Sequence, residues 1–145
     1  MNKKIYSYTL IVIAILAIAS ACGGGQEKII VKDAWARPGL EGGNSGVFLT
    51  IENHSGVDDQ LLNAVSNISS AVELHKTIME DGVMKMKQQV SVPIPANEQI
   101  DFKPGDLHIM LIELKSGLNV GDEFDVSLDF EHAGEIDLTV IVKEP

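Results

Sequence analysis

The chain has 145 residues, of which 21 are Asp or Glu and 11 are Lys or Arg, so its formal net charge is −10 at pH 7. So acidic a composition argues against nucleic-acid binding, because phosphate backbones are bound mainly by Lys and Arg. The only cysteine is Cys22. The fold therefore cannot rest on an intrachain disulfide and must be stable by packing alone.

Residues 1–21 are predicted to form a signal peptide of the lipoprotein type. Lys3 and Lys4 precede a short apolar run and the small residues of "ASAC" (19–22), which is the pattern of a secretory signal. The apolar run is too short to span a bilayer comfortably. "ASAC" resembles a bacterial lipobox, in which Cys22 becomes the lipidated first residue, although ordinary signal cleavage would instead leave a free thiol. We favour lipidation, because residues 22–27 then form a flexible tether between lipid and domain, and we expect an exported protein anchored in the periplasm or at the cell surface.

Residues 28–145 are predicted to form one all-β domain. Short β-branched runs separated by turn residues predict about nine strands, at 28–36, 46–53, 60–67, 71–79, 83–90, 98–103, 107–114, 123–130 and 135–143. A spacing of about ten residues is typical of a β-sandwich or barrel. "FDVSLDF" (124–130) alternates apolar and polar residues, as expected of a strand with one solvated face. "VPIPAN" (92–97) and "KPGD" (103–106) are interpreted as turns or edge crossings, because proline cannot donate to a β-ladder.

The segment "AVELHKTIMEDGVMKMKQQV" (71–90) predicts a β-hairpin, because Asp-Gly is the favoured pair for a two-residue type I′ turn. A turn at Asp81 and Gly82 places Met79 opposite Met84 and Thr77 opposite Met86. One face of the hairpin then carries His75, Thr77, Met79, Met84, Met86 and Gln88. His75 and Met86 become diagonal neighbours within side-chain reach.

A second His/Met pair lies in "GDLHIMLIEL" (105–114), where His108 and Met110 point to the same face of a strand. Taken singly, a methionine in a strand is usually core packing, and a strand histidine is usually a surface or satisfied core residue. Two His and two or more Met within two short segments favour a binding site instead. Met79 and Met84 are either core residues or auxiliary ligands near the mouth of such a site. His54 and His132 lie in turn-like contexts and are given no ligand role.

The donor types restrict the metal. Imidazole suits several transition metals, whereas thioether is soft and selects Cu(I). Zinc sites would want Cys or carboxylate beside the His, hard cations want oxygen cages, and a blue-copper centre needs a thiolate. Haem with His/Met ligation lacks support, because "CxxCH" is absent. The pattern therefore indicates Cu(I) that is carried rather than cycled, and a protein that is not an enzyme.

The spacing His75-x10-Met86-x21-His108-x-Met110 resembles the signature of the periplasmic copper chaperones called PCu(A)C. "AWARP", "NSGVFLTIEN", "FKPGDLHIML" and "FEHAGEIDLTVIV" agree with that family, so the resemblance covers nearly the whole domain. It implies a cupredoxin-like Greek-key β-sandwich that binds Cu(I) through these four side chains. It also implies delivery of copper to the copper-bearing subunit of cytochrome c oxidase, a haem–copper oxidase with a binuclear copper centre, alongside Sco-type copper proteins. The chain stops at "VIVKEP" without the His/Met-rich tail that some members use for Cu(II), which puts a second copper site in doubt.

We therefore expect a lipid-anchored, extracytoplasmic Cu(I) metallochaperone that acts by ligand exchange. One alternative is copper sequestration for tolerance, without a dedicated acceptor. Another is a structural or adhesive β-sandwich whose His and Met residues are incidental. A carrier site should be partly exposed, so we expect His108→Ala, as a surface substitution, to cost metal binding and almost no stability.

Overall fold

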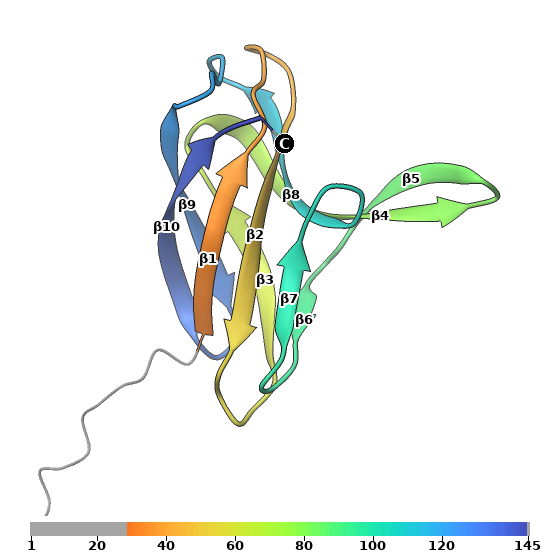
Figure 1. Cartoon of the computed structure of the whole chain (residues 1–145), viewed down its shortest axis with the longest axis vertical. Coiled ribbons are helices and arrows are strands. Elements are labelled where there is room, and N and C mark those ends of the chain that lie inside the picture. The colour runs from red at the N-terminus through yellow and green to blue at the C-terminus, as the bar shows by residue number, and fades with distance from the viewer. Residues whose placement is uncertain (1–28, 145) are drawn as a thin grey trace, which may run out of the picture.

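The computed structural model describes residues 29–144 and shows ten β-strands (Figure 1). The strands are β1 (Ile29–Ala36), β2 (Ser45–Asn53), β3 (Asp59–Val65), β4 (Ser69–Glu80), β5 (Val83–Gln88), β6 (Val92–Ile94), β7 (Gln99–Phe102), β8 (Leu107–Leu114), β9 (Glu123–Phe130) and β10 (Gly134–Val142). Within this range, no helix has the length and apolar character needed to cross a membrane. The predicted signal peptide and the tether that begins at Cys22 lie outside the described residues.

The strands form a single hydrogen-bonded sheet that is folded into two layers. Their order is β5-β4-β8-β2-β1-β10-β9-β3-β6, and β7 also pairs with β2. β2 pairs with two different strands along its length: residues 45–47 pair with β8, and residues 49–52 pair with β7. In Figure 1, β3 passes behind β1 and β2, so that the two layers enclose a core between them. The predicted all-β sandwich is thus confirmed.

The prediction of nine strands missed β6, which lies inside "VPIPAN". This strand pairs only with β3, and Pro93 stands opposite Gln60 in that pairing. An edge position tolerates proline, because an edge strand has a side that faces solvent, where no N–H donor is needed. The segment is therefore an edge strand of the sheet and not only a turn.

The core is built from the inward-facing residues of both layers. In β9, Phe124, Val126, Leu128 and Phe130 are buried while the residues between them are more exposed, as the alternating sequence predicts. β2 and β8 supply Val47, Leu49, Ile51, Ile109, Leu111 and Leu114. Each large apolar side chain of this kind stabilises the fold by about 1.5–3 kcal/mol on burial. Because Ile109 faces the core, its neighbours His108 and Met110 face the other side of the sheet.

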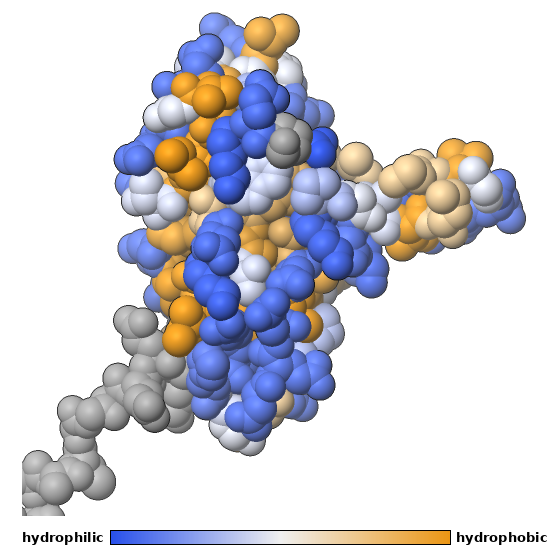
Figure 2. Space-filling model, in the orientation of Figure 1, coloured by the Kyte–Doolittle hydropathy of each residue, from blue (hydrophilic) through white to orange (hydrophobic). Residues whose placement is uncertain are grey.

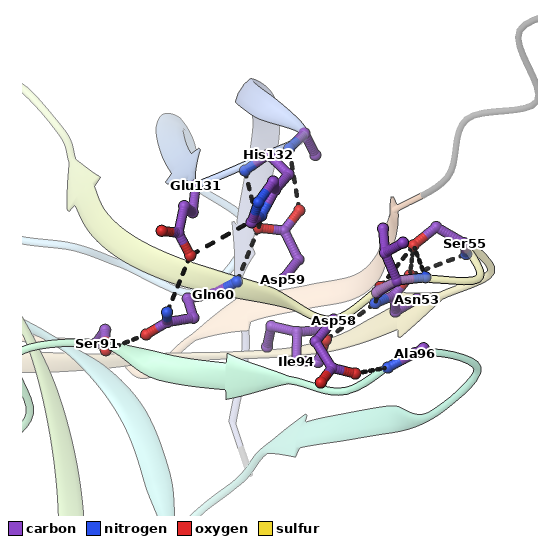
Figure 3. Close-up of polar contacts among 12 residues, drawn as sticks. Asn53, Ser55, Asp58, Asp59, Gln60, Ser91, Ile94, Ala96, Glu131 and His132 are labelled. Atoms are coloured by element: carbon purple, nitrogen blue, oxygen red, sulfur yellow. Dashed lines mark hydrogen bonds and ion pairs between the residues drawn. The ribbon is translucent and has the colours of Figure 1, made fainter.

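A buried carboxylate secures the turn between β9 and β10 (Figure 3). Asp59 is nearly inaccessible, and it accepts hydrogen bonds from the backbone N–H groups of Gln60, His132 and Ala133 at 2.7, 3.0 and 3.0 Å. Burial alone would raise the pKa of Asp59, but these donors together favour the carboxylate and hold the pKa below its ordinary value. The group thus stabilises the fold in its charged form.

Candidate metal centre

Two imidazoles lie on neighbouring strands where β4 pairs with β8. His75 on β4 is the direct register partner of His108 on β8. Their ring centroids are 5.8 Å apart, and the rings meet edge to face at 60°. The flanking residues Leu74 and Ile109 are also register partners and are buried in the core. Because side chains alternate along a strand, both imidazoles are placed on the outer face of the sheet.

Each imidazole has one ring nitrogen fixed by a hydrogen bond. His108 Nδ1 lies 2.9 Å from the backbone carbonyl oxygen of Asp106, and His75 Nε2 lies 2.7 Å from Glu73 Oε2. A carbonyl or carboxylate oxygen can only accept, so these two nitrogens carry the hydrogen. The other nitrogen of each neutral ring therefore presents a lone pair. Orientation of a metal-binding histidine by a carbonyl or carboxylate is the usual arrangement in protein metal sites.

The two nitrogens with free lone pairs are His75 Nδ1 and His108 Nε2, and both are buried. Neither has a hydrogen-bond partner among the groups of residues 29–144. A buried polar atom without a partner costs about 1–3 kcal/mol. A metal ion bound by these nitrogens would remove that cost, so the residues present fit a metal.

Two thioethers extend the donor set. Met110 follows His108 by two residues on the same face of β8. Met86 lies on β5, opposite Thr77 of β4. An open pocket of about 230 Å³ brings them together. It is lined by Met86, His108, Met110, Thr77, Arg37, Pro38, Asn44, Ser45, Gly46, Phe48, Pro104 and Gly105. His75 does not line this pocket, and its ring lies beside that of His108, with 5.8 Å between the centroids.

The hairpin that carries Met86 has the register that its sequence predicts. Asp81 and Gly82 both have positive φ, 53° and 77°, as a type I′ turn requires. His75 pairs with Gln88 and Thr77 pairs with Met86, so His75 and Met86 are diagonal neighbours. Met86 is 59% exposed. The site is therefore open to solvent on the hairpin side.

An aromatic wall closes the other side of the site. The rings of Phe48 and His108 have centroids 6.4 Å apart, and Trp35 packs on Phe48 at 4.7 Å. The Arg37 guanidinium lies 5.4 Å from the Phe48 ring centroid. As a result, His108 is only 5% exposed. The expectation that His108 behaves as a surface residue is wrong, because Phe48 covers it from the neighbouring strand β2.

The remaining methionine and histidine candidates lie outside the pocket. Met79 and Met84 face each other farther along the hairpin, do not line the pocket and are exposed, so they are not core residues. His54 pairs with Glu52, and His132 lies beside Asp59 at the β9–β10 turn. Neither lines the pocket. Cys22 lies in the part of the chain that the structure does not describe.

Sequence reasoning missed the residues that orient and enclose the donors. Glu73 precedes His75 by two residues and therefore shares its face, a signal that the sequence does contain. The Asp106 carbonyl, Arg37 and Phe48 carry no such local signal. In residues 29–144, no group of three or more His, Cys, Asp or Glu side chains is placed to hold a metal. The candidate donors are two imidazoles and two thioethers, a set that suits a soft cation.

Comparison with known proteins agrees with this fold. The chain is 40% identical to protein RP573 of Rickettsia prowazekii over 102 residues, which are 67% of this chain and 56% of RP573, so it matches little more than half the length of that relative. The copper-bound PCuAC domain from PmoF2 is similar in structure, with a TM-score of 0.69 and 24% identity over 81% of this chain and 94% of that domain. The Cu(I) form of DR1885 from Deinococcus radiodurans has a TM-score of 0.63 and 22% identity, with 85% of each chain covered.

The family is shown by a match over most of the described domain. Residues 29–142 match the model of the LpqE-like family, whose description reads "Putative lipoprotein LpqE-like". The match spans every strand from β1 to β10, and it includes all four proposed donors. The chain therefore belongs to the LpqE-like family.

Proposed function

We propose that this protein is an extracytoplasmic Cu(I) carrier that holds the ion with His75, Met86, His108 and Met110. The observation that carries the proposal is the pair of buried imidazole nitrogens without partners, beside two thioethers at an open pocket. The resemblance of the spacing to copper chaperones and the structural likeness to a copper-bound PCuAC domain and to the Cu(I) form of DR1885 support the same metal. The role is binding and transfer rather than catalysis.

The donor set favours Cu(I) over Zn(II). Imidazole binds a metal in its neutral form and a thioether carries no charge, so none of the four donors supplies a negative charge to offset a dication. Glu73 is engaged with His75 Nε2 and orients a donor instead of serving as one. Soft thioether sulfur stabilises Cu(I) much better than Zn(II).

Transfer to an acceptor would proceed by ligand exchange at the pocket. Met86 is the most exposed of the four donors and comes from the hairpin, so it is the ligand that an incoming thiolate or imidazole replaces first. His108 is buried and would leave last. The copper stays in the Cu(I) state throughout, so the exchange needs no redox partner and moves no proton.

We further propose that Cys22 carries a lipid that anchors the domain to the membrane, a role supported by the lipoprotein description of the family. Tethering raises the local concentration of a carrier near a membrane-bound acceptor. The acceptor proposed from the family resemblance is the copper-bearing subunit of a haem–copper oxidase, reached with or without a Sco-type protein. Cys22→Ser should move the protein from the membrane to the soluble fraction while its copper affinity stays unchanged.

The metal proposal is tested by competition against a Cu(I) chelator under reducing conditions. Wild-type protein should take up one Cu(I), and Zn(II) in excess should not displace it. His75→Ala, Met86→Leu and Met110→Leu should each weaken binding, whereas His54→Ala removes an exposed histidine outside the pocket and should leave it unchanged. Equal competition by Zn(II), or equal loss in His54→Ala, would contradict the assignment.

The acceptor proposal needs a separate experiment. Cu(I)-loaded protein is mixed with the metal-free copper domain of an oxidase, and copper is followed in both proteins after separation. Transfer that is faster than the spontaneous release of copper to a chelator supports delivery. A rate no faster than release would favour sequestration and leave the metal site itself intact.

A further inference from the structure

The end of the β4–β5 hairpin forms a two-stranded ribbon that leaves the sandwich (Figure 1). We use "the ribbon" for residues 77–86. The last residue of β4 that pairs with β8 is Lys76, opposite Leu107, and β5 pairs only with β4. The ribbon is therefore supported by one strand pairing and has both faces open, an arrangement that is rarely stable unless the rest of the fold anchors it.

The two faces of the ribbon have different chemistry. One face carries Thr77, Met79, Met84 and Met86, and the other carries Ile78, Glu80, Val83 and Lys85. Glu80 accepts a hydrogen bond from Lys85 Nζ at 2.8 Å, and Lys87 Nζ lies 3.7 Å from its other oxygen. These charged groups thus gather on one face, and the opposite face offers three thioethers and one hydroxyl.

The three methionines are unusually exposed. Met79, Met84 and Met86 are 67%, 61% and 59% exposed, and Figure 2 shows the ribbon projecting from the molecule with hydrophobic and hydrophilic residues side by side. Exposing apolar side chains in this way forgoes the stabilisation of burying them. Packing therefore does not account for three methionines at these positions, whereas metal binding by their sulfur atoms does.

The spacing allows the sulfur atoms to share one ion. Met79 and Met84 are direct cross-strand partners, so their Cβ atoms are about 4.5–5.5 Å apart. Met86 lies two residues beyond Met84 on the same face, about 7 Å along the strand. Methionine has three rotatable side-chain bonds and adapts its reach. Thioethers without carboxylate select a soft monovalent cation and reject hard divalent ones.

We propose that Met79, Met84 and Met86 form a second, weaker site for Cu(I) or Ag(I), through which the ion passes between solvent and the pocket. This inference rests on the proposed function of the pocket, because Met86 belongs to both donor sets. As the ion enters the pocket, a bond from the ion to His108 or Met110 forms as a bond to Met79 or Met84 breaks, while Met86 remains bound. No electron or proton is transferred.

The site is tested with Ag(I), which is soft and does not cycle between oxidation states under these conditions. Methionine methyl groups of the purified protein are labelled with carbon-13, and the pocket is disabled by His75→Ala together with His108→Ala. Addition of Ag(I) should shift the methyl signals of Met79, Met84 and Met86 with saturation near one equivalent. Unshifted signals from Met79 and Met84 would overturn the proposal.

A second measurement keeps the test valid if that double variant unfolds. Met79→Leu together with Met84→Leu, in otherwise wild-type protein, preserves side-chain volume. The pocket should keep its Cu(I) affinity, but loading from a weak Cu(I) donor should become several-fold slower. Val83→Ala, on the opposite face, is the control and should load at the wild-type rate. Unchanged loading in the methionine variant would refute the passage role.

Failure of the proposed function would give a different result. If addition of Cu(I) to the wild-type protein left the histidine ring signals unchanged, the pocket assignment would be wrong. The methyl shifts of Met79 and Met84 would still report on the ribbon by themselves. The two proposals are therefore judged by separate signals.

Discussion

Replacing His108 with leucine should remove copper binding and leave the metal-free fold nearly as stable as wild type or more stable. His108 is 5% exposed, so the substituted side chain has to fill a similar buried space beside Phe48. Leucine is apolar and close enough in volume to do so. Alanine would be a poorer choice, because it adds the cost of a cavity to any effect of the lost imidazole.

The expected stability change follows from two opposing contributions. Loss of the hydrogen bond from Nδ1 to the Asp106 carbonyl costs about 0.5–1.5 kcal/mol. Loss of the buried Nε2, which has no partner among the described groups, regains about 1–3 kcal/mol. The metal-free His108→Leu protein should therefore range from about 0.5 kcal/mol less stable to about 2.5 kcal/mol more stable than wild type.

Urea unfolding of both proteins, with and without one equivalent of Cu(I), measures the effect. Wild type should gain stability when copper is added, since a ligand that binds only the native state stabilises it by mass action. His108→Leu should gain none. The reasoning is refuted if the metal-free variant is destabilised by more than about 2 kcal/mol, the range expected for an ordinary core residue, and copper still stabilises it as in wild type.

Three further predictions follow from the surroundings of the site and from the buried carboxylate. Glu73→Ala frees the imidazole on β4 to rotate and should weaken Cu(I) binding by about 10–100-fold, whereas Glu52→Ala, beside an exposed histidine, should have no effect in the same chelator competition. Met86→Leu should weaken Cu(I) binding and Met84→Leu should not, since only Met86 lines the pocket. Asp59→Ala should lower the free energy of unfolding by about 1–3 kcal/mol at neutral pH, because three backbone N–H groups lose their acceptor. Because the folded pKa of Asp59 is lowered, its stabilisation is present above the ordinary carboxyl pKa of about 3.9 and is lost as the pH falls through the folded value. The difference between wild type and the Asp59 variant should then shrink in acid, and a constant difference from pH 7 to pH 2.5 in thermal melts would contradict this assignment.

The sequence by itself determined the local features of this protein. Alternating residues predict the strands, and Asp81-Gly82 predicts a turn whose register makes His75 and Met86 diagonal neighbours. These features depend on residues close together in the chain, where backbone geometry leaves few choices. The donor types of the four candidate ligands, imidazole and thioether, also favour a soft ion before any fold is known.

Only the tertiary structure decided how the two donor segments meet and how far they are buried. His75 and His108 become partners because β4 pairs with β8, and Phe48 covers His108 because β2 lies on the other side of β8. Long-range strand pairing depends on the packing of the whole core and leaves no local signal in either strand. For the same reason, the hydrogen bonds that fix each imidazole, and the burial that leaves one nitrogen of each ring without a partner, could be known only once the sheet was assembled.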